Sequence, residues 1–283
     1  MLNELVDGAR ENTANFDKKY YIDLTLGGCG HTLSLLQKEQ ESLVIGVDQD
    51  QDALDNAKSF LKKNNVMERV HLVKSNFSDI ATVLNESKLF TIGYQLGGVI
   101  ADIGVSSHQF DEKERGFSFR FDGPLDMRMN YSEPGETAAD VINDYDEESL
   151  VEIFKKYGEE KLAGRIAESI CKVRAEEKIV TTRQLENIVF HCYPKKWRHG
   201  RTHPATRVFQ ALRIFVNKEL EVLEKVIPSV ISILPAGSRF GIITFHSLED
   251  RIVKHTFRDF HRQKIVELVQ RKPILPSEEE LMV

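Results

Sequence analysis

The chain has 283 residues, of which 41% are hydrophobic, and its formal net charge is −6 at pH 7. That length suffices for one large domain or two modest ones, and the negative charge excludes a surface that attracts polyanions everywhere, so nucleic-acid binding would need a local basic patch. Three scattered cysteines, Cys29, Cys171 and Cys192, argue against a disulfide framework or a zinc site, so we expect no metal.

No apolar run reaches the length of a membrane span, and the first residues lack a signal-peptide pattern. We therefore expect a soluble, cytoplasmic protein in a reducing compartment, with no membrane partner. Residues 1–19 predict only a short helix. From 20 to 102 the apolar pattern alternates between strand and helix. Strands are predicted near 20–25, 42–47, 70–74 and 96–102, and helices near 31–38, 51–63 and 78–85.

This alternation is typical of an α/β fold with a mostly parallel sheet and helices on both faces. The first turn of that sheet contains Gly28, Cys29, Gly30 and His31 between an apolar strand and a helix. Glycine tolerates positive φ and lets a ligand approach the backbone, and the helix start presents free N–H groups. The turn lacks the third glycine of the dinucleotide fingerprint and the Gly-Lys-Ser/Thr of a P-loop. It predicts a cofactor site, and argues against a triphosphate.

Asp48 ends the second strand, at about the distance where an acid binds ribose hydroxyls. The local alternative is a helix-capping corner, since Asp50 or Asp52 precedes an amphipathic helix. Both roles are compatible, and the pattern favours a nucleoside-containing ligand. Ligands of parallel sheets bind outside the carboxyl ends of the strands, so we expect the glycine turn, Asp48, Phe77 and Asp102 to share one rim.

After Asp102 the alternation stops, and residues 103–109 predict a loop of small residues. The stretch up to about Tyr131 has no regular period and interleaves arginines with phenylalanines. Such a stretch can stack on nucleic-acid bases. The alternative is a long functional loop with buried aromatic rings, and we favour burial of Phe117, Phe119 and Phe121.

Residues 137–192 show helical spacing in four segments, with Thr181 to Gln184 as a cap for the last. These helices interrupt the α/β series. We therefore predict an α/β domain formed by residues 1–108 and 206–283, and an inserted helical domain at 109–205.

A basic loop follows the helical segments. It includes the chain's only tryptophan and no acid, and its key residues are Lys195, Lys196, Trp197, Arg198 and Arg201. Basic runs are often solvated surface. A tryptophan embedded in one favours contacts with phosphates and bases, so we assign these residues to nucleic-acid binding.

The C-terminal third predicts a return to the sheet. One long helix is expected over 205–234, bent at Pro228. A buried strand follows at 239–245, and Ser247 is the expected cap of the next helix. A last strand is expected at 264–270.

Several motifs in this chain occur in a fixed order across nearly its whole length. They are Asp23–His31, Asp102–Gln109, Glu114–Phe119, Asp122–Met129, Phe209–Asn217 and Phe245–Lys254. Together they closely resemble the bacterial ribosomal RNA small subunit methyltransferase H family, also called MraW. The resemblance implies a Rossmann-like class I methyltransferase fold, interrupted by the helical insert.

The resemblance also implies the reaction. Members transfer a methyl group from S-adenosylmethionine to the exocyclic N4 amine of a cytidine in the decoding centre of small-subunit (16S) ribosomal RNA. The implied partner is therefore the small ribosomal subunit. Phe77 would lie beside the adenine and Asp48 would hold the ribose hydroxyls. The implied cofactor-binding residues are Cys29, Gly30, His31, Asp48, Phe77, Asp102 and Gln109.

Because the methyl group of the donor is already activated, the enzyme mainly has to align the reactants. The amine lone pair of cytosine is delocalised, so a hydrogen-bond acceptor on the N–H would help by taking the proton. Asp102 and Ser106 are the candidates, with Asp102 first a cofactor contact. The target base must leave its stack, and recognition of folded RNA by shape falls to the insert.

Two departures from the family's pattern bear on RNA binding. The chain begins without the usual His-x-Pro-Val and ends on Glu-Glu-Glu-Leu-Met-Val instead of a basic segment. If that segment binds RNA in relatives, we expect this chain to bind more weakly or through other residues, or to be a truncated copy. The size of the insert favours an assembled subunit as substrate. The oligomeric state stays open, with a homodimer among the options.

Two other functions compete with this interpretation. An NAD-dependent oxidoreductase also fits Gly-x-Gly with Asp48, but it needs a hydride-transfer partner such as a Tyr/Lys pair, and no such pattern occurs. A ribosome-assembly factor that kept the fold without catalysis is the second alternative. Measuring methyl incorporation into RNA distinguishes this assembly factor from an enzyme.

Overall fold

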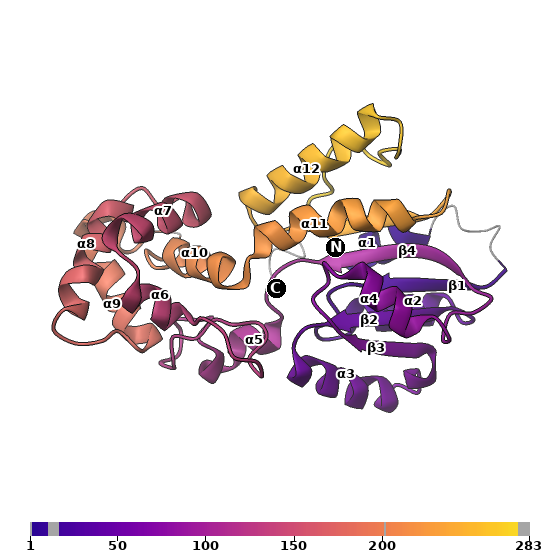
Figure 1. The fold of residues 1–283 in the computed structure, drawn as a ribbon, viewed down its shortest axis with the longest axis horizontal. Helices are drawn as coiled ribbons and strands as arrows, with labels where there is room; N and C mark the ends of the chain where they lie inside the picture. The colour runs from indigo at the N-terminus through magenta and orange to yellow at the C-terminus, as the bar shows by residue number, and fades with distance from the viewer. Residues whose placement is uncertain (1, 11–16, 201, 277–283) are drawn as a thin grey trace. The chain divides into compact units, whose positions relative to one another are not determined.

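The computed structural model describes residues 2–10, 17–200 and 202–276 (Figure 1). Two compact units emerge from the contacts within the chain, one formed by Met1–Gly104 with Leu220–Val283 and the other by Val105–Glu219. The second unit contains the expected insert and extends past it at both ends. Residues 206–217 belong to it because their helix packs on a helix of that unit.

The first unit is built on a five-stranded sheet in the order β3-β2-β1-β4-β5. Each strand pairs with its neighbours in parallel. The α/β, Rossmann-like prediction is confirmed. Its strands are β1 (Lys19–Asp23), β2 (Leu43–Asp48), β3 (Val70–Lys74), β4 (Gln95–Asp102) and β5 (Arg239–Ile243).

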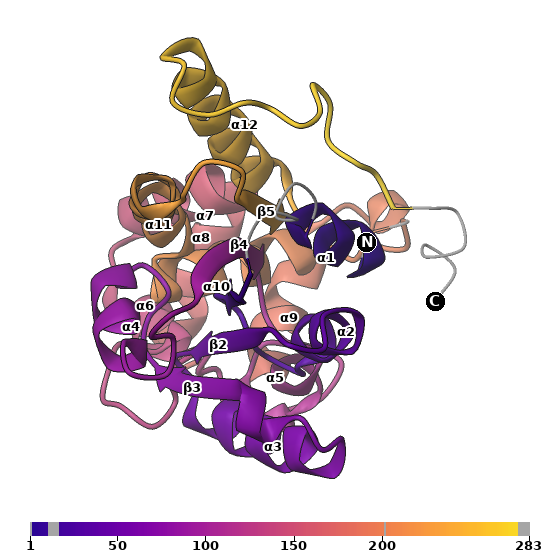
Figure 2. The same ribbon diagram turned by 90° about the vertical axis from the view of Figure 1, so that its right-hand side faces the viewer.

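Helices cover both faces of this sheet (Figure 2). Successive strand residues point to opposite faces, so Tyr21 packs with one set of helices and Ile22 with the other. The first set is α1 (Leu2–Arg10), α2 (Gly30–Lys38) and α3 (Gln51–Lys63). The second is α4 (Ile80–Ser87), α11 (Glu219–Ile233) and α12 (Ser247–Arg262). A 3₁₀ turn, Met67–Arg69, precedes β3.

The second unit is helical and has a core of its own. Its helices are α5 (Ser107–Asp111), α6 (Ala138–Asp144), α7 (Glu147–Gly158), α8 (Ala163–Arg174), α9 (Thr182–Cys192) and α10 (Thr206–Asn217), with 3₁₀ turns at Lys113–Arg115 and Lys195–Trp197. The expected cap of α9 is confirmed, because Thr181 and Gln184 form a reciprocal capping box.

The long irregular stretch before α6 is held by buried polar contacts. The Arg115 guanidinium, 5% exposed, donates to the carbonyls of Arg128 and Met129. Phe117 is buried and Phe119 half-buried, as expected, but Phe121 is 49% exposed. The prediction for Phe121 was wrong because the aromatic spacing carries no information on which ring of an irregular loop faces the core.

Four local predictions are corrected by the structure. The helix expected over 205–234 is two helices, because Lys218 adopts a left-handed conformation (φ 52°, ψ 36°) that ends α10. The 103–109 loop ends in α5. His246, not Ser247, caps α12. No strand forms at 264–270, where the chain turns back after α12.

The helices in the described parts of the chain include none that is both long and apolar enough to cross a membrane.

Candidate active site

The glycine turn leads from β1 into α2 at the carboxyl end of the sheet. Positive φ falls on Gly27 (43°) and on Cys29 (61°), the N-cap residue of α2, and not on Gly28. A Cβ at Gly28 would meet no atom within 4 Å. Gly28 therefore leaves open space beside the first turn of α2, where a ligand can approach the backbone.

A buried acid ties this turn to the centre of the sheet. Asp23, 1% exposed, accepts hydrogen bonds from Thr25 N (3.3 Å) and Thr32 Oγ1 (2.7 Å). Thr25 Oγ1 in turn accepts from Asp102 N at 2.6 Å. Burial raises the pKa of Asp23 from 3.8 to about 6, against the lowering by these hydrogen bonds. Hydrogen bonds of the Asp23 and Thr25 side chains thus link the ends of β1 and β4.

Asp48, at the end of β2, is held by backbone donors on both carboxylate oxygens. Gly27 N donates to Oδ2 (3.1 Å) and Asp50 N donates to Oδ1 (2.9 Å). Burial raises its pKa from 3.8 to about 6, so the group is mainly ionised at pH 7. A carboxylate accepts about four hydrogen bonds, which leaves capacity for hydroxyl donors. The cap of α3 is Asp50, which accepts from Asp52 N. Asp48 is therefore not needed as a helix cap.

Asp102 and His31 form the third part of the rim. His31 Nδ1 lies 3.9 Å from Asp102 Oδ2. Burial lowers the pKa of His31 and raises the pKa of Asp102, so each group is pushed toward its neutral form. Asp102 Oδ1 is buried and has no hydrogen-bond partner in the described parts of the chain. A buried oxygen without a partner is costly, and a ligand N–H would satisfy it.

The ends of β2 and β3 are joined beside Phe77. Asn76 Nδ2 donates to Gln49 Oε1 (3.2 Å), and Ser75 N donates to Asp48 O (3.1 Å). The half-buried Phe77 ring packs against the core of this sheet face. It supplies an apolar wall at the same carboxyl edge.

Cys29 contributes its backbone and not a nucleophile. The side chain is buried, and burial, with the charges of Asp23 and Asp48, raises the pKa of the thiol to about 12. A neutral thiol is a poor nucleophile. The rim can therefore bind polar groups of a ligand through Gly28, Asp48 and Asp102, and it offers a proton acceptor and no thiolate.

Comparisons with known proteins identify the family of this chain. The model of the MraW methylase family matches residues 1–283. The chain belongs to this family. A ribosomal RNA small subunit methyltransferase H from Sulfurihydrogenibium sp. is 44% identical over 261 residues, covering 92% of this chain and 86% of the relative. The protein of that name from Clostridioides difficile is 43% identical over 300 residues, covering 100% of this chain and 93% of its own. The family resemblance of the motifs is confirmed.

Within this family member, the first unit brings together six of the predicted cofactor residues at one sheet edge: Cys29, Gly30, His31, Asp48, Phe77 and Asp102. Gln109 and Ser106 belong to the second unit. There they cap α5 reciprocally: Ser106 N donates to Gln109 Oε1 (3.1 Å) and Gln109 N donates to Ser106 Oγ (3.2 Å). Their predicted roles stay predictions.

The basic loop divides into anchored and exposed residues. Arg198 donates through Nε to Tyr193 O (2.9 Å) and through Nη2 to His191 O (3.1 Å), and its guanidinium lies over the Phe190 ring. Lys195, Lys196 and Trp197 are exposed on a 3₁₀ turn, with Lys196 Nζ 4.9 Å from the centre of the tryptophan ring. Arg201 lies outside the described residues.

Sequence reasoning missed a polar pair beside Asp102. Glu249 is fully buried and its Oε2 accepts from Phe245 N (2.8 Å), while Oε1 lies 3.1 Å from His246 Nε2. The negative charge of Glu249 helps to raise the pKa of Asp102. The sequence signal for this pair is the His-x-x-Glu spacing at the start of a helix.

Proposed function

We propose that this protein uses S-adenosylmethionine to methylate the exocyclic N4 amine of a cytidine in the decoding centre of small-subunit (16S) ribosomal RNA. The observation that carries the proposal is a whole-length match to a methylase family, together with an acidic rim at the carboxyl ends of parallel strands, where such sheets bind ligands. The relatives named as small-subunit ribosomal RNA methyltransferases support the choice of RNA.

The residues of the rim fit this cofactor. Asp48, with spare acceptor capacity, would bind the ribose hydroxyls, and Phe77 would lie against the adenine. The open space at Gly28 admits the ligand to the backbone at the start of α2. Cys29, Gly30 and His31 would then contact it through this turn. When bound, S-adenosylmethionine supplies an activated methyl group on a sulfonium.

The chain's own part of the chemistry is to position the amine and to accept its proton. Asp102 is the stronger candidate for the acceptor, because its raised pKa makes it the better base and its buried Oδ1 has no partner in the described parts of the chain. Ser106 is the second candidate. Its Oγ already accepts from Gln109 N, so it is less free to accept an amine proton. Gln109 is proposed as a further cofactor contact.

The RNA would be bound by exposed cations and by the helical unit. Lys195, Lys196 and Trp197 are placed in water, where phosphates and bases can reach them. Arg198 would act by holding that loop in shape. The target base has to leave its stack to meet a reactive group at the sheet edge. We propose the assembled small subunit as the substrate, and a homodimer is compatible with this function.

The test is methyl transfer by the purified protein. Small subunits lacking the modification are incubated with methyl-labelled S-adenosylmethionine, and the RNA is digested and mapped by mass spectrometry. We expect one N4-methylcytidine in the decoding centre. Label on another base or position would contradict the N4 assignment, and no label with binding to subunits would favour an assembly factor.

A second measurement tests the substrate. Initial rates on isolated subunits, on protein-free ribosomal RNA and on a decoding-centre hairpin are compared at one salt concentration. The subunit is expected to react fastest, because the helical unit of Val105–Glu219 is larger than one flipped base requires. Equal rates on hairpin and subunit would rule out recognition of an assembled particle.

A further inference from the structure

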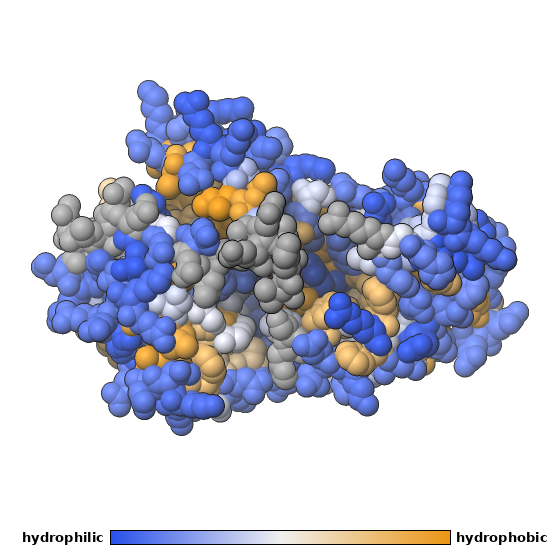
Figure 3. Space-filling view, turned by 180° about the vertical axis from the view of Figure 1, so that it is seen from behind, coloured by the Kyte–Doolittle hydropathy of each residue, from blue (hydrophilic) through white to orange (hydrophobic). Residues whose placement is uncertain are grey.

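The last described helix of this acidic chain and the segment after it are strongly basic. Between Arg251 and Lys272 there are seven Lys or Arg residues and two acids, a net charge of +5 in a chain of net charge −6. Figure 1 shows that α12 extends beyond α11, on the side away from the sheet. Hydrophilic side chains cover its projecting end (Figure 3). The basic charge is therefore concentrated on one projecting element.

The cations of α12 follow one helix face. Arg251, Lys254, Arg258 and Arg262 are spaced by three or four residues and are exposed. The apolar side of the helix, with Phe257, packs against the core of the sheet. Like charges at this spacing repel one another and weaken a helix. Their arrangement opposes helix stability, so it calls for a polyanionic ligand that would relieve the repulsion.

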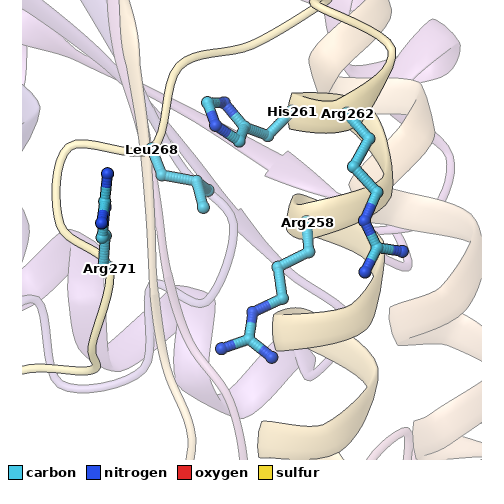
Figure 4. Close-up of a pocket in the computed structure, with 5 residues that line it drawn as sticks. All are labelled: Arg258, His261, Arg262, Leu268 and Arg271. Carbon is cyan, nitrogen blue, oxygen red and sulfur yellow. The ribbon is translucent and has the colours of Figure 1, made fainter.

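The same element borders a pocket. A cavity of about 280 Å³ is lined by Arg258, His261, Arg262, Leu268 and Arg271. Figure 4 shows that three of these residues come from α12 and that Leu268 and Arg271 come from the segment that turns back beside it. Guanidinium groups from two chain segments thus border one concave surface, here called the α12 pocket.

The charge of the α12 pocket is only partly balanced within the protein. Arg262 Nη1 lies 3.0 Å from Asp259 Oδ1, but both side chains are more than half exposed, at 76% and 59%. Such an exposed pair contributes little. Arg258 and Arg271 have no hydrogen-bond or ion-pair partner among the residues that the structure describes. Arginine presents a fork of donors that matches phosphate oxygens.

We propose that the α12 pocket and its basic helix face bind phosphate groups of the RNA backbone. The inference rests on the proposed function, and it adds a second RNA-binding surface to the basic loop that contains Trp197. RNA is favoured over a single small phosphate because the cations continue along the helix from Arg262 to Arg251, over several residues. A chain of negative net charge needs such a local patch to bind a polyanion.

The test compares two variants that each lose three positive charges. R258Q/R262Q/R271Q alters the α12 pocket, and K58Q/K62Q/K63Q alters the exposed face of α3. Binding of a fluorescein-labelled single-stranded RNA fragment of the decoding region is measured by anisotropy across KCl concentrations. We expect the pocket variant to bind at least about tenfold more weakly and its log K against log salt slope to fall by about 2, at roughly 0.7 for each lost phosphate contact.

The α3 variant should keep the wild-type slope, and the pocket variant should keep its melting temperature and its affinity for S-adenosylmethionine. R258K/R262K/R271K should retain most of the slope, since it keeps the charge. Asp259→Asn should bind RNA more tightly, because it removes a competing carboxylate beside Arg262. An unchanged slope in the folded pocket variant overturns the proposal.

Two further arms separate other sources of anionic groups. If tripolyphosphate competes as strongly as the RNA fragment at equal phosphate concentration, the pocket would be assigned to a small phosphate ligand. Charge-dependent binding of phosphatidylglycerol vesicles without an effect on RNA would assign it to a lipid surface. Both results overturn the proposal. Methyl transfer by the wild type is measured separately. If no methyl group is transferred but the salt slope of RNA binding still depends on the pocket arginines, the proposed function is refuted and the pocket assignment stands.

Discussion

The acidic rim of the sheet and the basic loop around Trp197 present opposite electrostatic problems. At the rim, Asp23 is buried and Asp48 and Asp102 are half-buried. Backbone N–H groups donate to one carboxylate oxygen of Asp23 and to both of Asp48. In the loop, Lys195 and Lys196 remain in water. Buried charge is expensive and needs compensation, whereas exposed charge costs little and is screened by salt.

This difference in burial distinguishes the rim from the loop as a candidate site. At the rim, burial raises the pKa values of Asp23 and Asp48 to about 6. Keeping these carboxylates ionised lowers the stability of the fold. Groups with perturbed pKa values cluster at functional sites. In the loop, Lys195 and Lys196 pay no desolvation cost because they stay exposed, and only Arg198 is tied to the main chain, by donating to two carbonyls.

The largest effect is expected for Asp102→Asn. The amide keeps the shape of the side chain and the backbone bond to Thr25, but it cannot accept a proton. We expect the rate constant for methyl transfer to fall by about 10²–10⁴-fold, the usual contribution of a general base. Single-turnover rates on small subunits measure this, with cofactor affinity determined in parallel. A rate within threefold of wild type would remove Asp102 as the proton acceptor.

The next effect concerns stability and its pH dependence. The pKa of Asp23 is raised in the folded state, so the folded protein loses stability as the pH rises from about 4 to about 6. Asp23→Asn lacks this loss. Its free energy of unfolding, relative to wild type, should therefore increase by up to about 3 kcal/mol between pH 4 and pH 7.

Urea denaturation at both pH values measures this difference. The comparison between the two pH values cancels any constant cost of changing the hydrogen bonds to Thr25 and Thr32. A difference between variant and wild type that does not change with pH would show that Asp23 titrates normally.

The third effect is on cofactor binding. Asp48→Ala removes a charged acceptor whose hydrogen bonds to ribose hydroxyls would contribute roughly 1.5–3 kcal/mol each. We expect calorimetry to find S-adenosylmethionine binding weakened at least tenfold, in a protein that still melts cooperatively. Asp55→Ala, an exposed acid of α3, is the matched control. Equal affinities for the Asp48 variant and the control would take Asp48 out of the site.

The smallest effects separate the residues of the basic loop. Lys195→Gln with Lys196→Gln should lower the salt slope of RNA binding by about 1.4, at roughly 0.7 for each phosphate contact, without changing the melting temperature. Arg198→Ala should instead lower the melting temperature by a few degrees, because two carbonyls and the Phe190 ring lose their partner. If all three positions change only the slope, Arg198 is an RNA contact and not an anchor.

The rim could be predicted in advance because its position depends on local pattern. Asp48 and Asp102 each end an apolar strand, and parallel strands place their carboxyl ends on one edge. The glycine turn was found for the same reason. Which residue takes positive φ was not predictable from the glycine pattern, because it falls on Gly27 and Cys29 and not on Gly28.

The unpredicted features depend on tertiary contacts. Glu249 is buried and its charge acts on Asp102, far from it in sequence, whose Oδ1 has no hydrogen-bond partner in the described parts of the chain. The α12 pocket forms where the segment with Leu268 and Arg271 turns back beside α12. At the break after α10, Glu219 beside Lys218 pairs with Arg213 through two hydrogen bonds of 2.8 and 2.9 Å, a side-chain contact that helical spacing does not reveal. Periodicity continued through that point, so helical spacing alone predicted one helix.

By itself, the sequence determined the α/β class, the five strands of the sheet and the family, because apolar period and motif order are properties that can be recognised in the sequence alone. Only the tertiary structure decided which charges are buried, which are anchored and which are left for a ligand. The physical reason is that desolvation depends on everything packed around a group. An aspartate at a strand end and a lysine in a loop are both charged residues in the sequence, and packing alone raises the pKa of one and leaves the other in water.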